Sequence, residues 1–295
     1  MIFLYLNENQ IKLLIFKKNI FSHYEIDYFK KDYETELLKN GQIFNIDILA
    51  SAIKEGLTFA KKSEGEKEIF LILPQNFFIF LRTEVPLNIA PSAIEGYVFE
   101  KLRDQFNIED ECLLSGMLSF QSEDKRIINF FGLNQKKFND LQKVFSLLNL
   151  KLINILPETV AYFKLFDKTL KKNKNEIIFY VNYQNNFVFG YLYDNFGLLK
   201  IDKWIAEVNE KNKLDVLIKK EKDRLEKLNL KPNRLILAGL ASENIRQDTF
   251  TKAIGIWTNP LKKIIANFYQ DYLKILIVDE KNVLPILSLD SCFGA

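Results

Sequence analysis

Two short apolar segments that end at prolines determine how this sequence is expected to fold. The first is IFLILP, residues 69–74, and the second is FFIFLRTEVP, residues 77–86. Apolar runs of this length, bounded by residues that interrupt strands, are typical of buried β-strands. A helix is expected from Pro91, because proline suits the first helical turn and apolar residues then recur at helical spacing as far as Phe106. The sequence therefore predicts an α/β unit around these two strands.

Similar patterns continue on both sides of these segments. Apolar runs separated by polar turns predict strands, and recurrence at three and four residues predicts helices. In the first half the further strands are expected at 2–6, 11–16, 20–29, 112–120, 127–133 and 150–155, and the helices at 45–62, 135–149 and 157–171. Asn45 is the expected cap of the first helix. Residues 69–155 therefore follow the order strand, strand, helix, strand, strand, helix, strand.

A polar linker at residues 171–175 separates this half from a second group of strands and helices. We place the main domain boundary there, with domains at 1–171 and 176–295 and an inserted subdomain at about 69–150. The expected strands of the second half are 177–181, 187–193, 198–201, 234–238, 273–278 and 284–287, and the helices are 205–228, 242–252 and 260–272.

Composition and charge exclude several classes of protein. The 41 basic and 38 acidic residues give a formal charge of +3, whereas a nucleic-acid-binding protein usually gathers a basic excess on one face. No apolar run approaches the roughly 20 residues needed to cross a bilayer. The first 16 residues carry polar side chains in their middle and do not resemble a signal peptide. We therefore expect a cytosolic protein that reaches a membrane only through a partner.

The residues that usually carry catalysis or metal binding are scarce. The single histidine, His23, cannot form a multi-histidine metal site. Cys112 and Cys292 are too far apart for a CxxC motif, and they are either two buried thiols or one long-range disulfide. None of the 11 glycines is adjacent to another or separated from it by one residue, so GxGxxG and Walker A loops are absent. This pattern argues against ordinary nucleotide hydrolysis.

The series of segments resembles PilM, the actin-like adaptor of type IV pilus assembly, within the family related to FtsA. Each segment is only weakly diagnostic, but they occur in the family's order along nearly the whole chain. The matching segments are Ile69–Pro74, Phe77–Arg82, Val85–Pro86, Ile94–Phe106, Asn129–Asn149, Leu150–Tyr162, Arg234–Gly239, Trp257–Pro260 and Ser288–Gly294. The resemblance implies a ribonuclease H-like duplicated, actin-like fold with an inserted ferredoxin-like strand-and-helix subdomain.

The sequence departs from this family where the family binds nucleotide. Asn7 and Asn182 stand where each half of the family carries the aspartate of an Asp-x-Gly phosphate loop, and the glycines are missing. Asparagine cannot hold Mg²⁺ or orient water as a carboxylate does. Gly239 is single where the family often has two or three glycines. Glu158 is either a remnant of the nucleotide site or an acid favoured in the first turn of a helix.

The resemblance therefore implies a non-catalytic adaptor at the inner-membrane platform of a pilus or secretion system. Its expected partner is the cytoplasmic tail of a PilN-like membrane protein, held in a groove between the first subdomain and the insert. Phe77, Phe78, Phe80 and Arg82 are candidates for the wall of this groove, although the phenylalanines are equally well explained as core residues. We expect no cofactor and no metal.

Three other interpretations remain at this point. An ATP-binding actin-like ATPase would need Asn7 and Asn182 at the phosphates, Mg-ATP as cofactor and Glu158 or another acid as base. An FtsA-like protein would need an amphipathic membrane helix after Ser291–Ala295. A cytoplasmic scaffold like the L-protein of type II secretion would continue into a membrane span.

Overall fold

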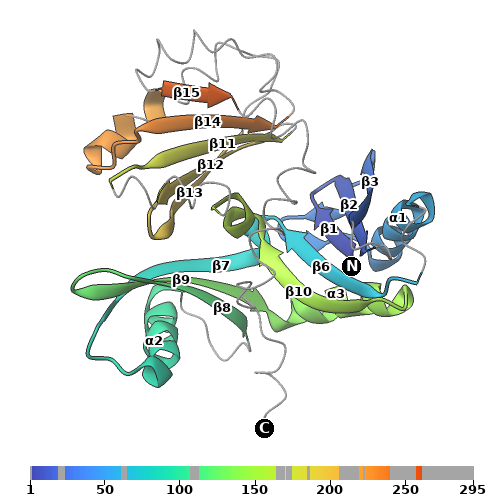
Figure 1. Ribbon diagram of the computed structural model, residues 1–295, viewed down its shortest axis with the longest axis horizontal. Helices are drawn as coiled ribbons and strands as arrows, with labels where there is room; N and C mark the ends of the chain where they lie inside the picture. Colours follow the sequence, from blue (N-terminus) through green and yellow to red (C-terminus); the bar gives the residue numbers. More distant parts are fainter. Residues whose placement is uncertain are drawn as a thin grey trace. The chain divides into compact units, whose positions relative to one another are not determined.

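The computed structural model describes two compact units (Figure 1). The described residues are 2–18, 24–60, 65–106, 113–163, 170, 175–184, 187–205, 219–221, 223–239 and 257–260. Unit 1 contains the described residues up to Ala161, and unit 2 contains those from Tyr162. This division precedes the polar linker at which the sequence placed the boundary. The linker lies outside the described residues except for Asn175, so the domain limits 1–171 and 176–295 remain a prediction.

The main sheet of unit 1 has five strands in the order β10-β6-β1-β2-β3. Its strands are β1 (Ile2–Leu6), β2 (Gln10–Lys18), β3 (Tyr24–Asp32), β6 (Glu68–Leu73) and β10 (Lys151–Pro157). The first three form an antiparallel meander, and β6 lies parallel to both β1 and β10. All five residues of β1 are buried, as the apolar pattern of the N-terminus predicts.

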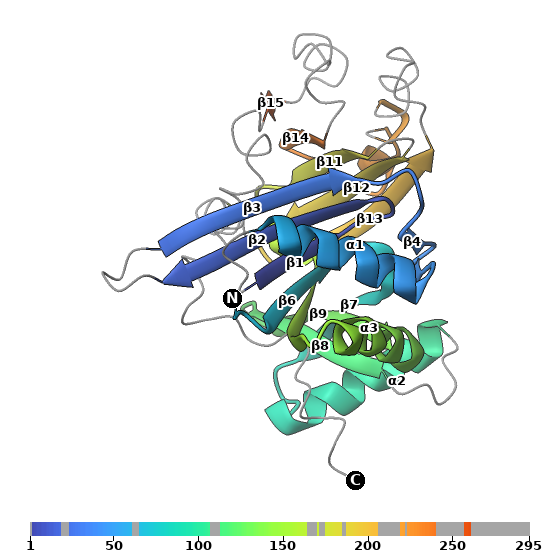
Figure 2. The same ribbon diagram turned by 90° about the vertical axis from the view of Figure 1, so that its right-hand side faces the viewer.

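Two helices pack against this sheet and against each other (Figure 2): α1 (Ile46–Phe59) and α3 (Gln135–Leu147). Asn45 caps α1 as predicted, because its side-chain oxygen accepts the N–H groups of Asp47 and Ile48 at 2.9 and 3.1 Å. A short hairpin, β4 (Leu38–Lys39) and β5 (Gln42–Ile43), precedes α1.

A smaller sheet lies between β6 and α3 in the chain. It contains β7 (Phe78–Pro86), β8 (Leu113–Gln121) and β9 (Lys125–Asn134) in the order β7-β9-β8. The short 3₁₀ helices η2 (Gln75–Phe77) and η3 (Pro91–Ala93) flank β7, and α2 (Ile94–Phe106) follows. One face of this sheet packs on α2 around the buried residues Leu81, Val85, Val98, Leu102, Ile128 and Phe130.

The predicted order of elements over residues 69–155 is confirmed. The expected insert at about 69–150 is broader than the small sheet, because β6 pairs with β1 and α3 packs on α1 and β10. A continuous apolar strand such as β6 is typical of a buried parallel sheet, and its pairing partners could not be read from its own residues. Among the described residues the insert therefore comprises three strands and α2, framed by η2 and η3.

Unit 2 repeats the plan of the first sheet. Its strands are β11 (Ile178–Gln184), β12 (Phe187–Asp194), β13 (Gly197–Ile205), β14 (Arg234–Gly239) and β15 (Trp257–Pro260). The order is β13-β12-β11-β14-β15, again a three-stranded meander whose first strand lies parallel to a fourth, which lies parallel to a fifth. This repetition agrees with the duplication that the sequence predicted.

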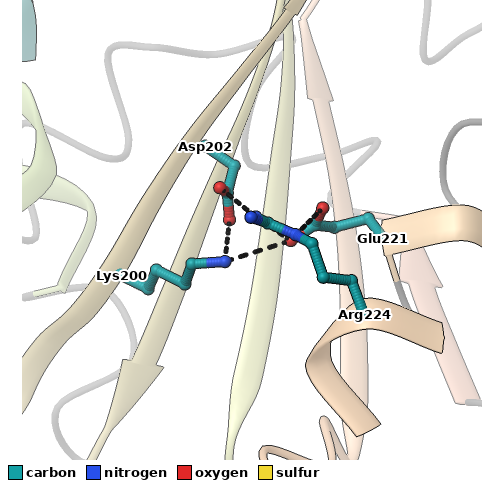
Figure 3. A network of polar contacts seen from close by, with 4 residues as sticks. All are labelled: Lys200, Asp202, Glu221 and Arg224. Atoms are coloured by element: carbon teal, nitrogen blue, oxygen red, sulfur yellow. Dashed lines mark hydrogen bonds and ion pairs between the residues drawn. The ribbon is translucent and has the colours of Figure 1, made fainter. Parts of the chain in front are cut away.

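A charged network fixes the helical residues 219–227 of unit 2, of which 222 is not described, to strand β13 (Figure 3). Arg224 binds both carboxylate oxygens of Glu221 at 2.9 and 2.7 Å and also reaches Asp202. Lys200 contacts Asp202 at 3.0 Å and Glu221 at 3.4 Å. Because Glu221 is buried, its pairing with two cations offsets the cost of removing its charge from water.

The structure corrects three element boundaries. The helix expected from Ile205 does not begin there, because Ile205 ends β13 and pairs with Phe187. Pro157 ends β10 rather than opening a helix, and helical residues begin at Glu158. The strand expected at 20–29 is described from Tyr24 and continues to Asp32.

Several further predictions lie outside the described residues. These are His23, Cys112, Cys292, the helix at 242–252, the strands at 273–278 and 284–287, and all but Pro260 of the helix at 260–272. Pro260 itself is the last residue of β15.

Candidate functional site

The carboxyl ends of the parallel strands β1, β6 and β10 meet at one edge of the sheet in unit 1. In open α/β sheets, ligands bind outside the carboxyl ends of the strands. The turn at residues 7–10 follows β1, Gln75 follows β6, and Glu158 follows β10. This edge is therefore the first place to look for a functional site.

Glu158 is the centre of a buried hydrogen-bond network at this edge. Its side chain is 1% exposed. One carboxylate oxygen accepts the hydroxyl of Tyr5 at 2.9 Å, and the other accepts the backbone N–H of Gln75 at 3.3 Å. The hydroxyl of Thr159 donates to the side-chain oxygen of Gln75 at 2.5 Å. The carboxylate thus connects the ends of all three parallel strands. Glu158 therefore has a structural role at this edge.

Two buried polar atoms of the residues directly after β6 have no hydrogen-bond partner in the described part of the chain. They are Nε2 of Gln75 and Oδ1 of Asn76. A buried polar group without a partner costs roughly 1–3 kcal/mol, so such atoms usually meet water or a ligand. The residues after β6 therefore retain some capacity to bind a polar group.

The turn that contains Asn7 is closed by its own hydrogen bonds. The backbone N–H of Asn7 donates to the carbonyl of Gln10 at 2.9 Å, and the N–H of Glu8 donates to Oδ1 of Asn7 at 2.7 Å. The carbonyl of Glu8 accepts the N–H groups of Leu37 and Leu38 at 2.6 and 3.1 Å. A phosphate loop needs its N–H groups directed at the phosphate, whereas two N–H groups of this turn already have acceptors within it.

The corresponding position in unit 2 lies in a regular strand pair. Asn182 lies within β11, where it pairs with Phe189 on one side and Ala238 on the other. The antiparallel ladder continues past it as far as the pair Gln184 and Phe187. The position expected for the second phosphate loop is therefore regular strand.

The side chain of Asn182 donates a hydrogen bond to a tyrosine that belongs to an aromatic stack. Its side chain is 5% exposed, and Nδ2 donates to the hydroxyl of Tyr162 at 3.2 Å. The ring of Tyr162 stacks on that of Tyr180 at 4.6 Å, and Tyr180 stacks on Tyr191 at 6.2 Å. Gly239 is the last residue of β14 and pairs with Tyr183. Asn7 and Glu158 thus belong to unit 1, and Asn182 and Gly239 to unit 2.

The candidate groove residues divide into a buried and an accessible pair. Phe77 and Phe78 are 2% and 8% exposed and belong to the core, in agreement with the core interpretation. Phe80 and Arg82 are half-buried on β7, and the ring of Phe80 lies 5.3 Å from that of Phe131. Strand β7 is one of the two outer strands of this sheet as far as the chain is described, and it carries both Phe80 and Arg82.

Sequence reasoning missed the residues that hold Glu158. Tyr5, Gln75 and Thr159 were not named as candidates, although each lies at or just after the end of a parallel strand or beside the acid itself. The signal available was Gln75 directly after Pro74, a polar residue where a fully apolar strand stops.

Two negative findings apply to the described part of the chain. No group of three His, Cys, Asp or Glu side chains in it is placed to hold a metal ion. None of its helices combines the length and the apolar character needed to cross a membrane.

Comparison with known proteins was informative only at the level of structure. No family model matches the chain, and no curated protein matches it in sequence. A solved PilM–PilN type IV pilus biogenesis complex matches with a TM-score of 0.70 at 12% identity, over 87% of this chain and 86% of that chain. A Bacteroides thetaiotaomicron protein of unknown function with an actin-like ATPase fold matches with a TM-score of 0.54 at 13% identity, over 94% and 95%.

This chain has the actin-like fold. The fold class predicted from the sequence is confirmed, and so is the resemblance to PilM at the level of the fold. A third match is the cytoplasmic domain of EpsL, an inner-membrane component of the type II secretion system of Vibrio cholerae. It has a TM-score of 0.50 at 10% identity and covers 81% of this chain and 82% of its own. At such low identities the actin-like fold is what these matches establish.

Proposed function

We propose that this chain is a non-catalytic, cytoplasmic actin-like adaptor of a type IV pilus or related secretion platform. It binds the cytoplasmic tail of a PilN-like membrane protein and is peripheral to the inner membrane through that partner. The observation that supports this proposal best is that the backbone at both phosphate-loop positions of the actin-like fold is already hydrogen-bonded or paired. The N–H groups of Asn7 and Glu8 are used within the first turn, and Asn182 lies in an unbroken ladder.

The choice of partner rests on the solved structures that share the fold. One of them is a PilM–PilN complex of pilus biogenesis, and another belongs to an inner-membrane component of a secretion system. Carried over to this chain, these likenesses favour a short peptide from a membrane protein as the ligand.

The outer edge of β7 is the proposed docking strand for that peptide. An extended peptide can add a strand to a sheet edge, with backbone hydrogen bonds giving affinity and side-chain contacts giving specificity. Phe80 offers an aromatic surface backed by Phe131, and Arg82 offers a cation two residues along the same face. Phe77 and Phe78 support this edge from the core.

A tail-binding experiment tests the adaptor role. The cytoplasmic tail of a PilN-like protein encoded near this chain is synthesised with a fluorophore. The purified protein is titrated into this peptide, and fluorescence anisotropy measures binding. We expect saturable binding that weakens at least tenfold, about 1.4 kcal/mol, in Arg82→Glu. Lys101→Glu on α2, which packs on the other face of the sheet, serves as the charge-matched control and should leave affinity unchanged. A wild-type chain that does not retain the tail would rule out this partner.

Titration of Mg-ATP by calorimetry, with a thermal-shift scan alongside, tests the absence of nucleotide function. Ligand at ten times its dissociation constant stabilises a protein by about 1.4 kcal/mol, which is a visible shift. We expect neither heat nor shift at millimolar Mg-ATP. Micromolar binding would show that the closed turns open for nucleotide and would overturn the argument from their hydrogen bonds.

The unpartnered atoms beside Glu158 favour a second candidate, an ATP-binding actin-like ATPase. Nε2 of Gln75 and Oδ1 of Asn76 are buried polar atoms that a ligand could satisfy next to a carboxylate. This candidate predicts Mg²⁺-dependent ATP hydrolysis that Glu158→Gln abolishes. Hydrolysis that is absent, or that persists in the variant, would exclude Glu158 as its base.

A further inference from the structure

Strand β3 is a long, regular edge of the main sheet in unit 1. It pairs with β2 over all nine of its residues without a bulge, and it contains neither proline nor glycine. No described strand pairs with its outer side (Figure 2). Natural proteins usually interrupt or cover such edges, because they act as templates for pairing with another chain.

The backbone of Tyr28 identifies which groups face away from the sheet. Its N–H donates to Oδ1 of the neighbouring Asp27 at 2.9 Å, so it is not directed at β2. Because the direction of backbone groups alternates along a strand, the N–H and C=O of Lys30 also face outward. Phe29, between them, directs its backbone groups toward β2.

We propose that two copies of this chain pair through β3, antiparallel and with the two-fold axis at Phe29, to form one continuous sheet. In this register Phe29 faces the same residue of the second copy in a non-hydrogen-bonded pair. Tyr28 and Lys30 of opposite copies exchange backbone hydrogen bonds through their outward groups. Such an interface is isologous, since the same strand serves both sides.

The charges of β3 are self-complementary in this register. Asp27 lies opposite Lys31 of the second copy, and the two-fold axis repeats this pair on the other side of Phe29. Opposite charges directly across an antiparallel pair are stabilising. Moving the axis to Lys30 would place two lysines face to face. Moving it to Tyr28 would leave Asp27 opposite Phe29 and pair Glu25 with Lys31 one step farther from the axis. The axis at Phe29 has its opposite charges nearest the axis and, within β3, leaves no acid opposite an aromatic ring, so the charge pattern favours it.

An exposed aromatic ring supports the same axis. Phe59, at the end of α1, is 68% exposed, and its ring stacks on that of Phe29 at 5.8 Å and 15°. Gly56 allows this close approach, because a Cβ there would lie 2.4 Å from Leu13 Cδ1 and 2.9 Å from Phe29 Cδ1. Pairing at Phe29 brings the two Phe59 rings toward each other and removes apolar surface from water.

Dimer formation replaces a hydrogen bond within each copy by one between the copies. The N–H of Tyr28 gives up Asp27 and donates to the carbonyl of Lys30 in the second copy. The carboxylate of Asp27 then also meets Lys31 of that copy. Lys31 already donates to Glu55 at 2.5 Å, and its three N–H groups allow it to meet both acids. The exchange predicts a reversible, concentration-dependent dimer.

Disulfide cross-linking tests the register. In a chain whose natural Cys112 and Cys292 are replaced by serine, Phe29→Cys should form an intermolecular disulfide under mild oxidation. Directly opposite residues of a non-hydrogen-bonded pair have Cα atoms about 4.5 Å apart, within the range that disulfides span. Tyr28→Cys is the control, because in this register the two cysteines would be offset by two residues. A cross-link at Tyr28→Cys and not at Phe29→Cys would overturn the proposed axis.

Sedimentation over a range of concentrations tests the interface without new cysteines. We expect Lys30→Pro to raise the dissociation constant of the dimer at least tenfold, because proline removes an outward N–H that the second copy needs. An edge strand tolerates proline where its N–H faces solvent, so the monomer should stay folded, which circular dichroism checks. Lys30→Ala removes the charge and keeps the N–H. Equal constants for the two variants, or a wild-type chain that stays monomeric throughout, would refute pairing through β3.

Discussion

The two sheets share one plan, but different side chains lie at the ends of their parallel strands. In unit 1 the buried carboxylate of Glu158, directly after β10, accepts a phenol hydroxyl and a backbone N–H at the carboxyl edge. In unit 2 the first strand carries Asn182, whose amide donates to the hydroxyl of Tyr162 beside stacked tyrosine rings. The shared strand order therefore determines where the strands end in each sheet, whereas the side chains determine which hydrogen bonds form there.

This difference has an energetic consequence. A buried charge requires partners, and removing its hydrogen bonds leaves unsatisfied groups on both sides. An amide that donates to the hydroxyl of a stacked tyrosine should contribute less, because the ring packing remains when that hydrogen bond is removed. Perturbations at the carboxyl edge of unit 1 should therefore cost more than comparable perturbations at the hairpin of unit 2.

The largest effect is expected from Gly41→Ala, which displaces the backbone of η2 next to Gln75. Gly41 has φ +72°, and a Cβ there would lie 2.1 Å from the carbonyl oxygen of Asn76. Backbone strain together with a clash against main chain should destabilise unit 1 by about 3 kcal/mol. Urea unfolding measures the loss, and hydrogen exchange of peptides from η2 locates it.

Gly65→Ala is the matched control for this substitution. Gly65 also has a positive φ, +85°, but nothing lies within 4 Å of its Cβ position. Strain alone should cost about 1 kcal/mol. Equal losses in the two variants would mean that the clash with Asn76 adds nothing to the cost of backbone strain.

A smaller loss, about 2–3 kcal/mol, is expected from Glu158→Leu. Leucine removes both acceptor oxygens and leaves the hydroxyl of Tyr5 and the N–H of Gln75 buried without them. Glu158→Gln keeps one acceptor oxygen and should lose about half as much. Chemical unfolding of the three proteins side by side gives the comparison. A leucine variant more stable than wild type would indicate that the carboxylate is retained for function at the expense of stability.

The fold was largely predictable because its signals are local. The apolar runs before Pro74 and Pro86 and the cap at Asn45 each report on their own segment, and each occurs as expected. The end of β13 was misjudged because the adjacent charges of Asp202 and Lys203 interrupt its alternation, although the strand continues to Ile205 next to a helical pattern. The extent of the insert was also misjudged, since the pairing of β6 with β1 depends on residues more than 60 positions away.

The sequence named candidate site residues but could not give their surroundings. Asn7 lies in the turn after β1, Asn182 lies within β11 and Glu158 directly follows β10. The sequence could not show that the turn at Asn7 closes on itself, because that depends on hydrogen bonds within the turn and to Leu37 and Leu38. It also could not separate Phe77 and Phe78 from Phe80, since burial of adjacent phenylalanines depends on which face the rest of the fold covers.

The smallest effect is expected in unit 2, from Tyr162→Phe. This change removes the acceptor of the Asn182 amide and keeps the ring on Tyr180, so the loss should be about 1 kcal/mol or less. Tyr162→Leu also removes the stacked ring and should cost distinctly more, which urea unfolding of both variants measures. If the phenylalanine variant instead lost as much as Glu158→Leu, the hydrogen bond of Asn182 would be as important as the carboxylate network. The two edges would then differ in the groups they use but not in how strongly hydrogen bonding holds them together.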